Sequence, residues 1–114
     1  MYGIAVRFPR SFLNETIFLF AGETPNEVFA NFHDVQDIEC HLMNIMSYLN
    51  EDDNDFAEDI YYNRYLDGQT ILPTELKRFF ELCPDVCLML DYMYDDNVVD
   101  ILKSKYPGAL YRRV

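Results

Sequence analysis

Residues 16–27, TIFLFAGETPNE, decide the fold because the chain changes there from a strand pattern to a helix start. The first six of these residues are β-branched, aromatic or aliphatic, which is typical of a buried strand. Thr24 and Glu27 have the spacing of a capping box, and Pro25 suits the first position of a helix. We therefore expect a strand followed by a helix that begins just after Thr24.

The residues on the amino-terminal side of this stretch predict a partner for the strand. Residues 2–8 have the same aromatic and β-branched composition, and the turn-prone Pro9, Ser11 and Asn14 separate them from residue 16. This order predicts a β-hairpin at the start of the chain.

A regular apolar pattern follows on the carboxyl-terminal side. Val35, Ile38, Leu42, Ile45 and Leu49 recur at spacings of 3, 4, 3 and 4 residues, which places them on one face of a helix running to about residue 50. Two arrangements fit: Asp34 caps a second helix, or it lies within one long helix that starts after Thr24.

Asp55 and Glu58 form another possible capping pair, with Phe56, Ile60 and Tyr61 as the apolar face of a short helix that ends near Asp67 and Gly68.

Helical and strand patterns continue to the end of the chain. Leu76, Phe79, Phe80 and Cys83 have helical spacing, and Pro84 would end that helix. Residues 86–93 fit either a strand or a helix, residues 96–105 predict a helix, and residues 109–114 predict a last strand. The prediction is one acidic α+β domain over residues 1–114, mostly helical, with an N-terminal β-hairpin and a small sheet.

The negative charge of the chain is concentrated in one part of the sequence. Residues 11–76 contain fourteen carboxylates and a single cation, Arg64, while the other 48 residues contain eight cations and six carboxylates, giving −11 in total. Such one-sided charge steers association toward basic partners and away from nucleic acid and anionic membranes. We therefore expect a basic protein partner, with no direct nucleic-acid binding and no membrane association.

The densest acidic cluster is followed at once by tyrosines. In one interpretation the carboxylates stand in for nucleic-acid phosphates and the tyrosines anchor the contact; in the other, the acids are a solvated helix start and the rings pack inward. A second acidic row could extend the same patch, or could mark the start of another helix. The candidate partner-binding residues are Glu51, Asp52, Asp53, Asp55, Glu58, Asp59, Tyr61, Tyr62 and Tyr65, with Asp91, Asp95 and Asp96 in the second row.

The sequence predicts no catalytic residue, cofactor or metal site. A calcium loop starting at Asp53 would need a glycine at Glu58 and a glutamate at Arg64. Cys40, Cys83, Cys87, His33 and His41 lack the paired spacing of zinc ligands. Asp37 and His41 could pair, but no nucleophile motif or grouped glycines accompany them.

An odd number of cysteines and the lack of a secretory leader pattern favour the reducing cytoplasm.

In size, charge and lack of a catalytic motif, the chain resembles the small acidic inhibitors that bacteria and phages use against nucleases: immunity proteins, antitoxins and anti-CRISPR proteins. The likeness is one of composition and covers no motif. It implies an inhibitor that masks the phosphate-binding groove of a nuclease or another nucleic-acid-handling protein. The alternative is an assembly module whose acidity serves solubility. Its interface would be the edge of the hairpin or the apolar helix face from Val35 to Leu49, which we call the 35–49 seam.

Overall fold

The computed structural model describes residues 1–7, 17–35, 38–82 and 97–113. Within them, the strands β1 (Tyr2–Arg7), β2 (Ile17–Gly22) and β3 (Leu110–Arg113) form one sheet in the order β1-β2-β3. Strands β1 and β2 pair antiparallel, with Ile4 opposite Phe20, and β3 pairs parallel to β2. The predicted N-terminal hairpin, small sheet and last strand are thus confirmed.

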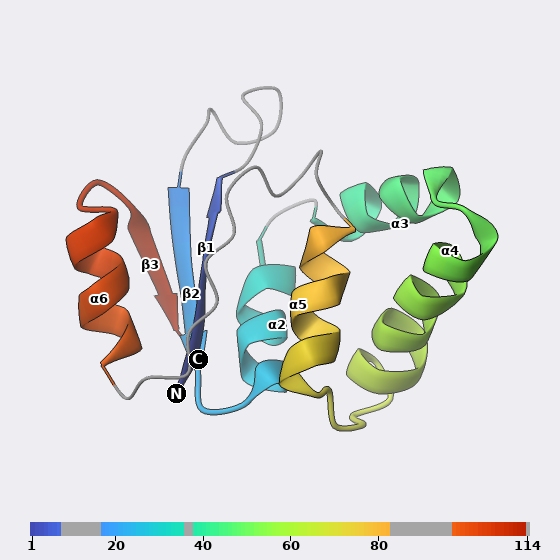
Figure 1. The fold of residues 1–114 in the computed structure, drawn as a ribbon, viewed down its shortest axis with the longest axis horizontal. Helices are drawn as coiled ribbons and strands as arrows, with labels where there is room; N and C mark the ends of the chain where they lie inside the picture. Colours follow the sequence, from blue (N-terminus) through green and yellow to red (C-terminus); the bar gives the residue numbers. More distant parts are fainter. Residues whose placement is uncertain (8–16, 36–37, 83–96, 114) are drawn as a thin grey trace.

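Alternate residues of the hairpin supply two separate hydrophobic clusters, as the two-residue period of a strand requires. Ile4, Val6, Phe18 and Phe20 belong to the large core on one face of the sheet. Ala5 and Leu19 point to the other face and pack with Val98 and Leu102 of α6 (Val98–Lys105). Figure 1 shows α6 on one side of the sheet and the other helices on the opposite side. The two hairpin strands, β1 and β2, are therefore buried on both faces.

Helix α2 (Pro25–His33) starts as the sequence predicts. The Thr24 hydroxyl accepts a hydrogen bond from the Glu27 amide over 3.2 Å, and the Glu27 carboxylate accepts one from the Thr24 amide over 3.3 Å. Phe29 and Phe32 of this helix are fully buried, and the Phe20 and Phe32 ring centroids lie 5.7 Å apart. The capping box therefore fixes the helix that covers the sheet.

The 35–49 seam belongs mainly to a helix that is separate from α2, so the predicted alternative of one long helix is wrong. Asp34 is the C-cap of α2, and α3 (Ile38–Tyr48) begins only at Ile38, so Asp34 caps the end of the first helix and not the start of the second. Val35, Ile38, Leu42 and Ile45 are buried in the core. The seam is therefore occupied inside the molecule, and the proposal that it forms an interface is wrong.

The next helix begins earlier than predicted. Helix α4 (Glu51–Glu58) is capped by Asn50, whose side-chain oxygen accepts a 2.9 Å hydrogen bond from the Asp53 amide. Asp55 and Glu58 lie inside this helix, so their predicted capping role is wrong: an asparagine five residues upstream caps the helix first. The π-helix η1 (Asp59–Tyr65) continues from α4, and Gly68 ends the segment with a φ of 69°.

Helix α5 (Pro73–Glu81) buries Leu76, Phe79 and Phe80 as predicted and ends before Cys83 and Pro84. Those two residues, and residues 86–93 whose structure was left open, lie outside the described residues. The predicted helix near residues 96–105 is α6, which begins at Val98.

Candidate interaction surface

The first acidic cluster lies on α4 and the start of η1, at one end of the molecule (Figure 1). Glu51, Asp52 and Asp53 occupy the first turn of α4. Negative side chains are favourable there because the amide groups at a helix N-terminus carry partial positive charge. The partial charge at the helix N-terminus thus explains why acidic residues start α4. The surface that these residues form depends on how they are arranged around the helix axis.

Five of the six carboxylates share one side of the helix. At about 100° per residue they fall within an arc of about 120°, and Asp53 falls on the opposite side. Glu51, Asp52, Asp55 and Glu58 are exposed, and the side chain of Asp59 is 44% exposed. We call the five residues Glu51, Asp52, Asp55, Glu58 and Asp59 the acidic ridge.

Asp53 is not part of the ridge, because its carboxylate contacts other residues of the fold. Its carboxylate lies 3.6 Å from the guanidinium of Arg78 on α5 and accepts a hydrogen bond from the Asn50 side chain. The Arg78 guanidinium also lies 4.1 Å from the ring centroid of Phe56. Asp53 therefore holds α4 against α5, so we leave it out of the interaction surface.

Among the described residues, one cation forms an ion pair with the ridge. Arg64 lies 3.5 Å from Asp59 and 3.6 Å from Glu75, and its guanidinium donates to the carbonyl of Thr70. These contacts turn Arg64 toward α5 and the loop before it. The ridge thus retains most of its negative charge.

The three predicted tyrosines have three different environments. Tyr61 is 1% exposed, and its hydroxyl forms a 3.0 Å hydrogen bond with Nε2 of His33. Tyr65 is partly buried, with its ring centroid 4.6 Å from that of Phe29. Tyr62 is 42% exposed. Tyr61 is a core residue because it packs against α2, so its predicted role as a surface anchor is corrected. Of the three predicted tyrosines, Tyr62 is the exposed one.

Burial raises the pKa of Tyr61 well above its ordinary value, and the nearby Glu39 carboxylate adds to this because an anion disfavours a second negative charge. The pKa of Tyr65 is also raised, first by burial and then by Asp34 and Glu39. Both hydroxyls stay protonated over the whole neutral range, and that of Tyr61 is hydrogen-bonded to His33.

Two exposed apolar side chains flank the ridge and were not predicted. Tyr48, at the end of α3, is 83% exposed, and Leu66, just after η1, is 53% exposed. One signal in the sequence could have indicated the exposure of Tyr48, because this residue lies off the apolar spacing that ends at Leu49. In the chain, Tyr48 comes shortly before the acidic ridge, and Tyr62 and Leu66 come shortly after it.

Other predicted features give no further site within the described part of the chain. Asp91, Asp95 and Asp96 lie outside it, as do Asp37, Cys83 and Cys87. Cys40 is exposed, and the described residues include no group of three or more His, Cys, Asp or Glu side chains arranged to hold a metal ion. None of the described helices has both the length and the apolarity needed to cross a membrane.

Comparison with known proteins gives no relative: no protein-family model, curated protein or solved structure matches this chain.

Proposed function

We propose that this chain binds a basic, nucleic-acid-handling protein through the acidic ridge and blocks the groove that would hold a nucleic-acid strand. The observation that carries the proposal is the placement of five carboxylates on one side of the continuous helical segment formed by α4 and the first residue of η1. Groups on one side can contact a cleft together, whereas scattered charges of the same number cannot.

The spacing of the ridge charges supports this partner class. From Glu51 to Asp59 the five charges span about 12 Å at about 1.5 Å per residue, or about one charge every 3 Å. One strand of B-DNA carries a charge about every 3.4 Å along the axis, and the whole duplex one every 1.7 Å or so. The ridge therefore matches the charge density of a single strand better than that of a duplex.

The exposed rings of Tyr48 and Tyr62 would supply lasting affinity, which charge alone does not. Electrostatic attraction raises the association rate, but desolvated aromatic contacts contribute most of the lasting affinity at protein interfaces. Tyr48 and Tyr62 are exposed near the two ends of the ridge. In a groove built for single strands, such rings would meet the aromatic side chains that normally stack on bases.

The test is affinity capture from an extract of the source cells at low and high salt, followed by competition with single-stranded and duplex oligonucleotides. The test variant is Glu51→Gln/Asp52→Asn/Asp55→Asn/Glu58→Gln. The control, Asp34→Asn/Asp67→Asn/Glu81→Gln/Asp100→Asn, removes four exposed carboxylates elsewhere and leaves the same net charge.

We expect the wild type and the control to capture the same basic protein, with capture weakened by salt and by single strands, and the test variant to lose it. Circular dichroism checks that the test variant folds, since removing first-turn carboxylates costs only about 0.3–1 kcal/mol each. Equal capture by both variants, unaffected by salt and oligonucleotides, would contradict the proposal and favour the assembly-module alternative.

A further inference from the structure

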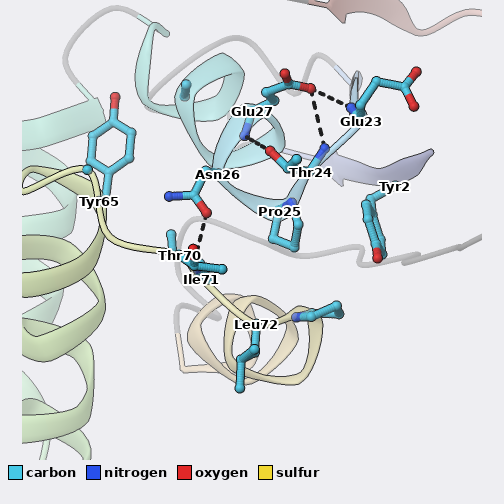
Figure 2. A pocket seen from close by; sticks show the side chains of 13 residues that line it. Tyr2, Glu23, Thr24, Pro25, Asn26, Glu27, Tyr65, Thr70, Ile71 and Leu72 are labelled. Atoms are coloured by element: carbon cyan, nitrogen blue, oxygen red, sulfur yellow. Dashed lines mark hydrogen bonds between the residues drawn. The ribbon is translucent and has the colours of Figure 1, made fainter.

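A pocket of about 680 Å³ lies where η1 ends, between the start of β1, the start of α2 and the loop before α5. Figure 2 shows Tyr65 and Tyr2 at opposite sides of this pocket, Glu23 and Glu27 near each other along a third side, and Leu72 across from them. Its size is in the range of sites that bind small molecules, so it has room for a side chain together with part of the segment that carries it.

The loop before α5 forms one wall of the pocket, and hydrogen bonds hold this loop in place. The side-chain amide of Asn26 donates to the carbonyl of Gln69 over 2.7 Å, and its oxygen accepts from the amide of Ile71 over 2.8 Å. The guanidinium of Arg64 donates to the carbonyl of Thr70 over 3.0 Å. A wall fixed before binding lowers the conformational entropy that a ligand must offset.

The polar groups around the pocket disfavour an anion. Helices α2 and α5 both begin there, and helix N-termini ordinarily attract anions. Here the first helical residue of each is a proline without an N–H, and the protein's own carboxylates accept the amides beside it: Glu27 those of Glu23 and Thr24, Glu75 that of Leu72. Glu23 and Glu27 line the pocket, and none of its described lining residues is Lys or Arg.

The remaining lining fits a cation that has an apolar stem. Pro25, Ile71 and Leu72 provide apolar surface, and the Leu72 side chain is 52% exposed at this pocket. Tyr2 and Tyr65 line the pocket, and aromatic rings are groups that attract a guanidinium. An arginine side chain combines the two needs, because its methylene stem packs on apolar surface while its planar head binds aromatic rings and carboxylates.

We propose that this pocket binds an arginine side chain from an extended segment of the basic partner. The inference rests on the proposed function for the source of that arginine, and it adds a second contact that lies beyond the acidic ridge along the same η1 segment. The ridge recognises the charge of the partner groove, and the pocket recognises one side chain.

The test is titration of the ¹⁵N-labelled full chain with the peptide acetyl-Gly-Arg-Gly-amide and its citrulline counterpart, followed by amide NMR shifts. Citrulline has nearly the same shape without the charge. We expect the arginine peptide to shift the amides of Glu27, Gly68 and Ile71, and the citrulline peptide to bind about tenfold more weakly, a difference of about 1.4 kcal/mol. Glu23→Gln should weaken binding of the arginine peptide, and the matched change Glu81→Gln on the exposed part of α5 should leave it unchanged.

The ridge variant with four neutralised carboxylates separates this inference from the proposed function. It should bind the arginine peptide like the wild type, even though it no longer captures the partner. Equal binding of both peptides, or shifts confined to residues 51–59, would overturn the pocket assignment. That result would leave the capture experiment to decide the proposed function by itself.

Discussion

Tyr61 shows how one side chain can be read as a surface anchor in the sequence and serve the core in the structure. It stands next to Tyr62 in an acidic, tyrosine-rich stretch, and the sequence alone does not tell which ring faces outward. The π-helical geometry of η1 turns Tyr61 and Tyr65 toward the aromatic residues of α2. The hydroxyl of Tyr61 then pairs with His33, which satisfies a polar group that burial would otherwise penalise.

Because the pKa of Tyr61 is raised in the folded state, the stability of the protein should fall at alkaline pH. An unfolded tyrosine loses its proton near pH 10, whereas folded Tyr61 keeps it. Above about pH 10 the unfolded state therefore binds fewer protons than the folded state, and the free energy of unfolding decreases as pH rises. Below that pH the contribution is fully present. Urea unfolding between pH 8 and 11 measures the effect.

Tyr61→Phe provides the comparison for this pH dependence. It should cost about 1 kcal/mol at neutral pH through the lost hydrogen bond, and should make the alkaline decrease shallower, with Tyr65 still contributing. Tyr48→Phe, on a ring that is 83% exposed, should change neither quantity. An alkaline decrease of the same steepness in Tyr61→Phe and wild type would show that Tyr61 is not its source.

At the scale of elements, patterns with a clear period were predictable and local choices between competing caps were not. The hairpin, the α2 capping box and the Leu76, Phe79 and Phe80 face followed from residue type and spacing. The start of α4 did not, because Asn50 and Asp55 are both good N-caps and the sequence gives no reason to prefer the first. The π-helix that continues from α4 was not predicted either, because no residue pattern in the sequence marks it.

The candidate surface was predictable to the same extent. Five of the predicted acidic residues lie on the same side because α4 and the start of η1 form one continuous helical segment, in which their spacing places them within one arc. Asp53 and Tyr61 left the predicted set because Arg78 and His33, which come from other helices, meet them in space. Tyr48 and Leu66 were missed because the exposure of an apolar side chain is set by what packs over it.

The contact between β2 and α2 makes a second prediction at the scale of elements. A Cβ atom at Gly22 would lie 2.6 Å from Cβ of Glu27 and 3.0 Å from the backbone nitrogen of Val28, so Gly22→Ala must push the start of α2 away from the strand. We expect a loss of about 1–3 kcal/mol in the free energy of unfolding, measured in urea. Gly108→Ala is the matched control, since nothing lies within 4 Å of its added atom. Equal stability of the two variants would contradict the described contact.

At the scale of the whole molecule, the fold separates charge along its length. Figure 1 shows α4 at one end and α6 with β3 at the other, in a molecule 38 Å long. Helix α6 carries Lys103 and Lys105, and Arg112 and Arg113 belong to β3. The length of the molecule is several times the screening length of about 8 Å at physiological salt, so Lys103 and Lys105 at the far end do little to offset the field of the ridge. If the proposed function holds, the acidic end is the end that the basic partner approaches.

The central claim is that the acidic ridge is the surface that enters the partner's groove, and carboxyl footprinting of the complex tests it most directly. The captured complex and the isolated chain are each labelled with a carbodiimide and an amine, and labelling at every carboxylate is read by mass spectrometry. We predict that the complex protects Glu51, Asp52, Asp55 and Glu58, while Asp34, Asp67, Glu81 and Asp100 label as in the isolated chain. Full labelling of the four ridge residues in the complex, with protection elsewhere, would contradict the claim.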